Sequence, residues 1–448
     1  MKLNKSTLYI TTLMLLGGHV FAQETSLDSK IETYLATKSQ TTTTTTTQTS
    51  QPSRLTIGGY GEAVYRYNAY SSDVFRYSHA DRHKDDKGHG QVDLPHAVIM
   101  MGYDFGHGWS FGTEIEFEHG GVEAAVEMED EEAGEYEKEI ERGGEVALEQ
   151  FWLQRKFSDA LHVRMGHMVV PVGATNNAHL PTEFFGVYRP EGENTVLPCT
   201  WHETGISLWG QAGGWRYEAM LLPALNSTMF NTSGWANGAS ASAYEFRAAN
   251  NLAIAARVDN TSIPNLRLSL SGYIGNTFNN DIAISTSSRY ADVKGTVAIG
   301  AFDFLYKTTN FVARGNADYG YLSDATLISA YNTRLSNSTG SPYPHMRVGQ
   351  AAYTAGAEMG YNLMHAAQHP ERKLFVFGRY DIYDSYVPAE DMVDIEWTYR
   401  QCITLGVNYR PLPQIVVKAE CGYRWFKEQY NNEPFVAIGI TWSGMFNR

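Results

Sequence analysis

Nine basic side chains are the residues of this sequence best suited to chemistry with a charged solute. Eight lie on the polar side of segments in which apolar and polar residues alternate, and Arg189 lies in a proline-rich stretch. A planar guanidinium makes paired hydrogen bonds to phosphate or carboxylate groups, so arginine suits anion binding. The nine candidates are Arg164, Arg189, Arg216, Arg257, Arg267, Arg314, Arg379, Lys418 and Arg424.

Acidic side chains occupy the polar side of the same segments, which leaves two interpretations of the basic residues open. In the first, acids and bases pair across an interior and brace its wall. In the second, the basic residues form a filter that selects ions by charge. The inward-facing acids are Glu114, Glu116, Glu118, Glu149, Glu218, Asp303, Glu358, Asp381 and Glu420.

The stretch 170–200 combines four prolines with two adjacent aromatic residues, Phe184 and Phe185. Proline stiffens a loop, and large apolar side chains favour burial over exposure to water. We therefore expect this stretch to fold into the interior, where Arg189 with Arg164 lines the narrowest part. The prolines are Pro171, Pro181, Pro190 and Pro198.

Two further charged clusters carry weaker signals. Residues 123–141 hold ten acids and one lysine, a pattern that is usually a solvated loop but that also attracts cations. Three histidines and three aspartates lie within residues 79–89, yet their spacing fits no defined metal site. The sequence contains neither a GxSxG nor an HExxH motif. We predict no metal, no cofactor and no enzymatic activity.

The elements that must position these side chains are strands with one apolar and one polar face. In 434–446, for example, Val436, Ile438 and Ile440 alternate with smaller or polar residues. Such alternation is typical of a strand between an apolar and a wet environment. The pattern predicts strands at 55–67, 92–104, 109–119, 145–157, 161–169, 201–210, 214–222, 251–259, 265–275, 296–306, 310–321, 350–363, 373–384, 399–410, 414–427 and 434–446.

The connections between these strands sort by length, which a β-sandwich gives no reason to expect. Gaps of a few residues alternate with long gaps rich in Asn, Ser, Asp, Glu and Gly. Short turns at one end and long loops at the other are typical of outer-membrane barrels. We predict an all-β fold, a transmembrane antiparallel β-barrel of about 16 strands (14–18 possible), with long extracellular loops and short periplasmic turns.

The N-terminus indicates export from the cytoplasm. Lys2 and Lys5 precede a short apolar stretch, and Val20-Phe21-Ala22 resembles a cleavage site, which predicts a signal peptide at 1–22. Residues 23–53 are expected to be a periplasmic N-terminal segment with a Thr-rich linker. Residues 54–448 are expected to form the barrel, so we expect the protein in the cell outer membrane.

The composition argues against several classes of protein. A formal net charge of −14 disfavours nucleic-acid binding. No uninterrupted apolar run of 18 residues follows residue 22, which argues against a bundle of membrane-spanning helices. An aromatic content of 13% argues against a disordered chain. The three cysteines, at wide spacing, predict free and buried thiols rather than a disulfide framework.

Two stretches of the sequence resemble a known family. Leu55-Thr56-Ile57-Gly58-Gly59-Tyr60-Gly61-Glu62 is similar to the first strand of porins in the phosphate-selective porin O/P family. The longer match, 163–210, includes Arg164-Met165-Gly166-His167 and the stretch 181–190. The resemblance covers roughly 55–446 and implies an outer-membrane porin, commonly a homotrimer, with arginines along its lumen and a long loop inside the pore.

From this resemblance we expect a water-filled channel for diffusion of small hydrophilic solutes or ions, including anions such as phosphate. The expected partners are outer-membrane lipid, the solutes themselves and two further copies of the chain, with no nucleic acid. Two other interpretations stay open. One is a secreted or surface β-protein such as an adhesin, and the other is an outer-membrane barrel hydrolase.

Overall fold

The computed structural model describes residues 54–119, 127–128, 138–139, 146–240, 247–280, 288–334, 346–365 and 371–446. The predicted signal peptide and N-terminal segment lie outside the described residues. The acidic stretch 123–141 also lies outside them, except for the two-residue strands β5 (Glu127–Met128) and β6 (Lys138–Glu139). Among the described residues, no helix is long and apolar enough to cross a membrane.

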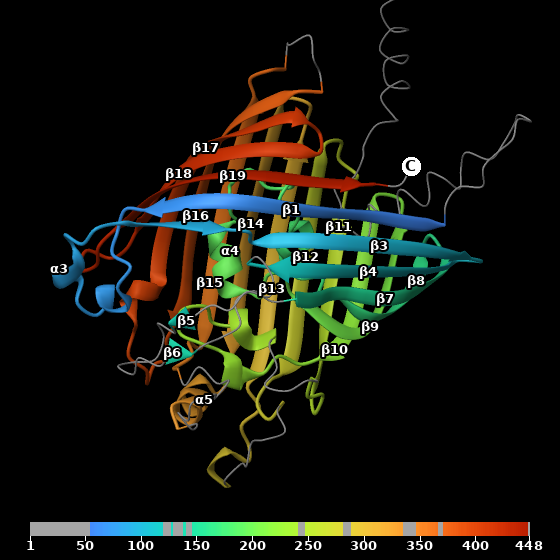
Figure 1. Ribbon diagram of the computed structural model, residues 1–448. Helices are drawn as coiled ribbons and strands as arrows, with labels where there is room; N and C mark the ends of the chain where they lie inside the picture. The colour runs from blue at the N-terminus through green and yellow to red at the C-terminus, as the bar shows by residue number, and fades with distance from the viewer. Residues whose placement is uncertain are drawn as a thin grey trace, which may run out of the picture.

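One antiparallel sheet closes on itself as a barrel, because β1 pairs with β19 along eleven residue pairs. Figure 1 shows the strands following one another around a single curved wall. The strands are β1 (Leu55–Asn68), β3 (His96–Gly106), β4 (Trp109–Glu118), β7 (Val146–Ser158), β8 (Leu161–Val169), β9 (His202–Ala212), β10 (Trp215–Pro223), β11 (Leu252–Asn260), β12 (Leu266–Asn276), β13 (Thr296–Lys307), β14 (Phe311–Leu322), β15 (Ala351–Asn362), β16 (Lys373–Val387), β17 (Tyr399–Leu412), β18 (Ile415–Trp425) and β19 (Glu433–Met445).

A further strand, β2 (His89–Asp93), shares one position in the wall with β3. Both pair with β1, with β2 opposite its second half and β3 opposite its first half. They are separated by Leu94 and Pro95, and proline has no N–H with which to continue the ladder. The barrel therefore has 16 strand positions, and the predicted all-β barrel is confirmed.

The connections sort by length as predicted. Short turns such as His107–Gly108 and 213–214 lie at one end, and both β1 and β19 have their chain-terminal ends there. Every helix is in a long connection, and Figure 1 shows α3 and α5 away from the C-terminus. The helices are η1 (Val74–Arg76), α3 (Ala80–His83), η2 (Asn176–Ala178), α4 (Glu191–Val196), η3 (Ser227–Met229), η4 (Asn237–Ser240), η5 (Ser288–Tyr290), α5 (Ala325–Asn332) and η6 (Glu396–Thr398).

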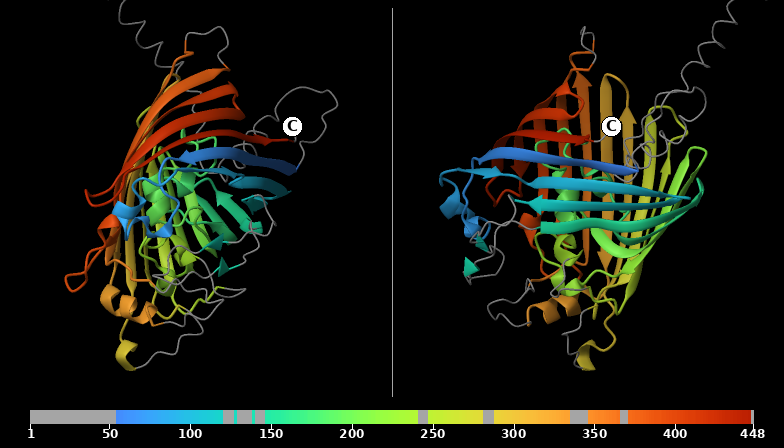
Figure 2. Two further views of the ribbon diagram at one scale, coloured as in Figure 1. Left: turned by 60° about the vertical axis from the view of Figure 1, so that its left-hand side comes forward. Right: turned by 45° about the vertical axis from the view of Figure 1, so that its right-hand side comes forward.

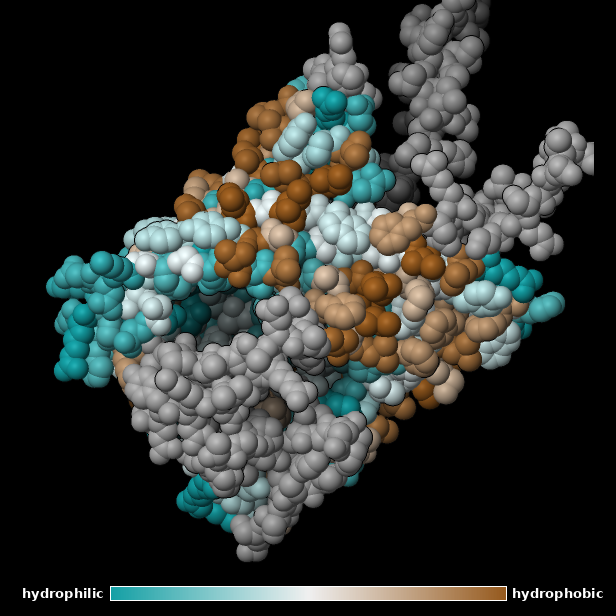
Figure 3. All heavy atoms as spheres, viewed as in Figure 1, coloured by the Kyte–Doolittle hydropathy of each residue, from teal (hydrophilic) through white to brown (hydrophobic). Residues whose placement is uncertain are grey.

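The two faces of the wall reverse the pattern of a water-soluble protein. On β12, Leu270 is 64% exposed and Ile274 is also exposed, whereas Ser269 and Ser271 are buried. Figure 3 shows apolar side chains spread over the outward surface of the strands, with hydrophilic ones gathered at the end that carries α3. Strands alternate in this way when their outer face meets lipid and their inner face is polar.

The hydrophobic core lies inside the barrel, where long connections fold back and pack against inward-facing side chains. Trp201, Phe230 and Trp235, from two different connections, are fully or almost fully buried there. Figure 2 shows the green segment that carries α4 enclosed by the curved wall. The interior is therefore divided between a packed core and the polar groups described next.

Candidate functional site

Residues 170–201, which we call the inner loop, lie inside the barrel and are held by side chains of the wall. Five of its carbonyl oxygens accept hydrogen bonds from side chains of the wall, and three of these contacts fix its two halves. Arg257 Nη1 donates to Gly173 O over 3.1 Å, Asn408 Nδ2 to Phe185 O over 3.1 Å, and Lys418 Nζ to Gly186 O over 2.6 Å. The expectation that this stretch folds into the interior is confirmed.

Two polar side chains organise the inner loop itself. The Asn176 amide donates to the carbonyls of Val170 and Trp201 and accepts from the Trp201 N–H, which ties the two ends of the loop together. The Glu193 carboxylate accepts the backbone N–H groups of Ala174 and Thr175 and the Thr175 hydroxyl. Sequence reasoning did not single out either residue, because their partners become neighbours only when the loop folds.

The basic residues of β10 to β13 form a continuous chain of ion pairs with neighbouring acids. Asp259 and Asp303 each lie between two guanidinium groups, and Glu218 pairs with Arg216, so three acids neutralise three arginines on this part of the wall. The contacts are Arg216 to Glu218 (2.8 Å) and Asp259 (3.6 Å), Arg257 to Asp259 (2.8 Å) and Asp303 (2.8 Å), and Arg267 to Asp303 (3.1 Å).

A second chain of ion pairs continues along β14 to β16. Glu358 contacts Arg314 at 3.0 Å and Arg379 at 3.7 Å, and Arg379 also contacts Asp381 at 2.8 Å. Arg314 in addition donates to the Glu183 carbonyl of the inner loop. These arginines therefore brace the wall and hold the loop at the same time, which is the first of the two sequence interpretations.

The structure gives Arg164 and Arg189 different surroundings. Arg164 is buried on β8, where its guanidinium lies 4.5 Å from the Trp152 ring centroid and donates to Gln154. Arg189 belongs to the inner loop and donates to the Thr200 hydroxyl over 3.1 Å. No contact joins the two arginines within the described part of the chain. Whether either controls conduction stays a prediction.

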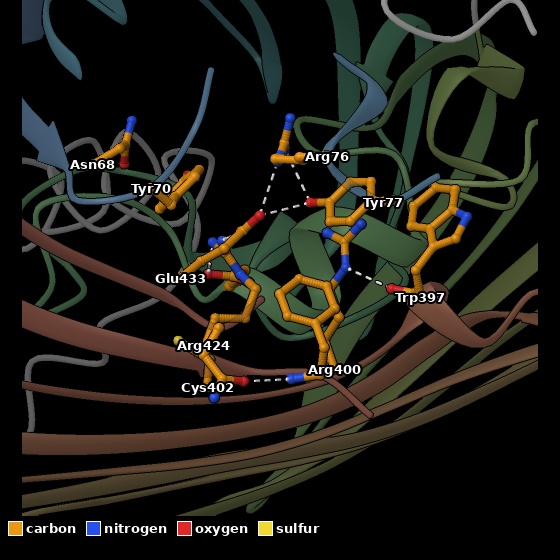
Figure 4. A network of polar contacts seen from close by, with 12 residues as sticks. Asn68, Tyr70, Arg76, Tyr77, Trp397, Arg400, Cys402, Arg424 and Glu433 are labelled. Atoms are coloured by element: carbon orange, nitrogen blue, oxygen red, sulfur yellow. Dashed lines mark hydrogen bonds and ion pairs between the residues drawn. The ribbon is translucent and has the colours of Figure 1, made fainter. Parts of the chain in front are cut away.

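Arg424 belongs to a network at the long-loop end that the sequence analysis missed. It pairs with Glu191 of the inner loop at 2.6 Å and with Glu433, which also accepts hydrogen bonds from Arg76 and Tyr77. Figure 4 shows Arg76 and Tyr77 converging on Glu433. Burial works against the charge of Arg76, but Tyr77 and Glu433 raise its pKa, so this guanidinium stays charged.

Aromatic rings complete this network. The Tyr77 and Trp397 rings stack with centroids 4.9 Å apart, and the Arg400 guanidinium lies within 6 Å of both rings. Figure 4 shows Arg400 rising from β17 toward Tyr77 and Trp397. Cation–π contacts of this kind stabilise a charged group away from water. Tyr77 and Trp397 come from two connections and Arg400 from β17, so their spacing in the sequence carries no signal.

A cleft runs between the inner loop and the wall formed by β12 to β16, and it encloses about 660 Å³ of empty space, part of it open to solvent. Arg267 and Arg314 keep 17% and 21% of their side chains exposed. The charged residues that line the cleft are Glu183, Glu193, Arg267, Asp303, Arg314, Glu358, Arg379 and Asp381. The cleft is thus lined by three arginines and five acids, together with apolar groups of the inner loop and the wall.

The cysteines are free, as expected, but they are not all buried. Cys402 faces inward and is buried, whereas Cys421 is exposed and Cys199 is partly exposed. The expectation of three buried thiols was wrong for Cys421, because its strand position points to the outer surface of the barrel. An outward position suits a thiol there because this surface is apolar.

Comparisons with known proteins were made by sequence and by structure. No family model matches the sequence. An uncharacterized protein of Aquifex aeolicus (strain VF5) is 25% identical over 398 residues, which cover 87% of this chain and 79% of the relative.

Two solved structures illustrate the likeness in fold. The anion-selective porin from Comamonas acidovorans aligns with a TM-score of 0.51 and 10% identity over 87% of this chain and 99% of that chain. The outer membrane channel DcaP of Acinetobacter baumannii aligns with a TM-score of 0.49 and 10% identity over 90% of this chain and all of that chain. The likeness to the first of these structures shows a shared antiparallel β-barrel fold.

Proposed function

We propose that this protein is an outer-membrane channel through which small hydrophilic solutes and ions diffuse. Two features support the membrane location. The sheet closes without a free edge, and large apolar side chains cover its outward face. Lipid cannot hydrogen-bond to backbone groups, so a spanning sheet must close in this way. The polar inward face supports passage of water and ions through the interior.

The observation that carries the channel proposal is the cleft between the inner loop and β12 to β16. A barrel completely filled by its loops would conduct nothing, whereas this cleft keeps Arg267 and Arg314 partly exposed. A guanidinium in a narrow and partly desolvated passage acts more strongly on an ion than the same charge in bulk water. These two residues are therefore our candidates for the charges that a passing solute meets.

The charges along the cleft favour general diffusion over phosphate selectivity. Each of the three lining arginines is paired with a carboxylate, and paired guanidiniums have fewer donors left for a phosphate group. Five acids line the same space. The resemblance to the phosphate-selective porin O/P family stays an interpretation of the sequence. The acids in the cleft are Glu183, Glu193, Asp303, Glu358 and Asp381.

Planar bilayer recordings test this function. The purified protein should insert with stepwise increases in conductance, and its reversal potential in a salt gradient gives the ion preference. Arg314→Ala should shift the reversal potential toward cations, because it removes a positive charge from the cleft. Arg189→Ala tests the sequence prediction that this residue also lies at the constriction, and it should shift the potential in the same direction.

A matched control separates a lumen effect from a change in net charge. Arg155→Ala removes the same charge from β7, where the side chain belongs to the outward-facing set with Leu153 and Phe157, and it should leave the reversal potential unchanged. Folded protein that inserts without any conductance steps would contradict the channel proposal. An unchanged reversal potential in Arg314→Ala would show that the solute path avoids the cleft.

The alternatives from the sequence receive less support. A secreted adhesin requires a water-compatible surface, whereas residues such as Leu270 and Ile438 are more than half exposed on this one. No catalytic constellation at the cleft favours a hydrolase among the described residues.

The homotrimer stays a proposal, and native mass spectrometry of the detergent-extracted protein should give a mass of three chains.

A further inference from the structure

A second buried polar group lies on the wall away from the cleft. Glu114 of β4 and Glu149 of β7 point inward, and His179 of the inner loop meets them. One ligand atom of each side chain can be chosen so that all three lie within 4.8 Å of one another. None of the three residues is more than 1% exposed. The group joins two strands to the loop, and the proposed channel function makes no use of it.

A β-bulge explains why β7 directs two neighbouring side chains to the interior. Glu114 pairs with Gln150 and Ile115 pairs with Leu148, so Glu149 is the extra residue on β7. A bulge re-aims a side chain, and here both Glu149 and Gln150 are buried. Gln150 Nε2 donates to Glu114 Oε2 over 2.6 Å and so orients the first carboxylate, while the bulge adds the second.

The hydrogen bonding of His179 directs its Nε2 at these carboxylates. Its Nδ1 lies 3.0 Å from the Asn176 carbonyl, and because a carbonyl can only accept, Nδ1 carries the proton. Its Nε2 lies 3.9 Å from Glu149 Oε1, which is too far for a hydrogen bond. Both His179 Nε2 and Glu149 Oε1 are buried without a hydrogen-bond partner. Metal-binding histidines are held in this way, with the other ring N–H donated to a carbonyl or carboxylate.

The charge balance at this group differs from that of the arginine-rich wall. Asp303 and Glu358 each contact two arginines, whereas no lysine or arginine of the described chain lies within ion-pair distance of Glu149. The positive groups that act on Glu149 electrostatically are His179, His202 and Arg189, and its Oε2 accepts a hydrogen bond from the Tyr60 hydroxyl over 3.4 Å. Two buried carboxylates that face one another are costly unless a cation lies between them.

We propose that Glu114, Glu149 and His179 bind one divalent transition-metal ion, with Zn²⁺ as the best match. An imidazole nitrogen together with two carboxylates suits Zn²⁺ better than Ca²⁺ or Mg²⁺, which take oxygen ligands. Zinc bonds of about 2.0–2.2 Å require the ligand atoms to approach by small side-chain rotations. Three protein ligands leave a fourth position for water.

A metal ion at this site would attach the inner loop to the barrel wall. Arg257 and Lys418 hold the inner loop to β11 and β18, and the metal ties the same loop to β4 and β7. The loop is then fixed to the wall at separate points around the barrel. Removal of the ion therefore releases the loop on one side while its arginine contacts remain.

Zinc titration of the full-length mature protein tests the proposal. The protein is extracted from outer membranes, stripped with a chelator and titrated with Zn²⁺ by calorimetry. The parent should bind one equivalent, and Glu149→Gln and His179→Gln should each weaken binding by about 100-fold or more, since even an indirect partner is worth 10–100-fold. X-ray absorption of the zinc-loaded parent should show one imidazole, which keeps the test valid if a variant does not fold.

A second histidine inside the barrel provides the matched control. His96 lies 2.6 Å from Glu62 and 3.8 Å from Glu116, so it also neighbours carboxylates. His96→Gln should keep zinc affinity within about twofold of the parent. The proposal fails if the parent binds no zinc, if His96→Gln abolishes binding while His179→Gln preserves it, or if equimolar Ca²⁺ or Mg²⁺ displaces the zinc.

Discussion

Single inward-facing charges meet their partners because of strand register. Glu358 lies directly opposite Arg314 on one neighbouring strand and Arg379 on the other. Residues two apart on a strand share a face, so an arginine also meets the acid two positions along, as Arg379 meets Asp381. Removing one partner of a buried pair costs about 3–5 kcal/mol. These pairs support the bracing interpretation, and the filter role of Arg267 and Arg314 stays part of our proposal.

Glu193 predicts a pH dependence of the channel. Burial raises its pKa to about 7, although hydrogen bonds from Thr175 and Ala174 oppose the shift. The carboxyl group is neutral below that pKa and adds a negative charge to the cleft above it. Raising the pH from about 6 to 8 should therefore shift the reversal potential toward cations, and Glu193→Gln should remove this step.

The raised pKa also has a consequence for stability with a definite sign. The folded state binds the Glu193 proton more tightly than the unfolded chain, so the free energy of unfolding should fall as the pH rises from the ordinary glutamate pKa of 4.5 to about 7. In the pH experiment on the reversal potential, Asp159→Asn at an exposed turn serves as the control. This variant should keep the step in reversal potential between about pH 6 and 8. An identical pH profile in Glu193→Gln and the parent would exclude Glu193 as its source.

At the scale of the element, the inner loop is a fold within the barrel rather than a free connection. The Asn176 amide closes its two ends, and Glu193 caps its first turn. Arg257 and Lys418 then fix its backbone to the wall. A loop held by its own backbone groups keeps one shape, because each carbonyl and N–H has a defined partner away from water.

Gly173 is a position of the inner loop where the packing leaves no room for a side chain. Its φ is 83°, and Glu193 Oε1 occupies the place that a Cβ atom would take. Gly173→Ala should break the Glu193 hydrogen bonds as well as strain the backbone. The control, Gly213→Ala, has a φ of 58° with no atom within 4 Å of the new Cβ, so it only strains a turn.

The free energy of unfolding, measured by urea titration in detergent, should separate the two alanine variants. Gly173→Ala should lose about 1.5–3 kcal/mol more than Gly213→Ala, the range for hydrogen bonds to a charged group. The inner loop should also become more accessible to protease in Gly173→Ala. Equal losses in both variants would mean that the Glu193 contacts contribute nothing to the fold of the loop.

At the scale of the whole molecule, the outward apolar surface predicts that lipid stabilises the fold. Leu270→Arg places a charge near the middle of β12 and should destabilise the barrel in lipid by about 2–4 kcal/mol. Leu252→Arg lies at the long-loop end of β11 and should cost only about 0–1 kcal/mol, because a long side chain there reaches water. Equilibrium unfolding in phospholipid vesicles measures both, and a neutral Leu270→Arg would favour a water-soluble β-protein.

The sequence by itself determined the architecture, because that architecture follows from local patterns. Alternation with a period of two reports which face of each strand meets lipid, and every predicted barrel strand lies within a few residues of its place in the structure. The alternation of short and long connections indicates that the sheet closes into a barrel, with short turns at one end and long loops at the other. The prolines and the aromatic pair of 170–200 also indicated that this stretch folds inward. Each of these signals is contained in a short stretch of chain.

The tertiary structure alone decided which side chains meet. The bulge at Glu149 depends on the pairing of β7 with β4, which decides that the adjacent Glu149 and Gln150 both face inward. The Asn176 and Glu193 contacts depend on the path of the inner loop. Tyr77 and Trp397 from two connections meet Arg424 of β18, and Tyr77 and Arg424 are more than 300 residues apart. Such contacts depend on closure of the barrel, which brings distant strands and loops together without any local sequence signal.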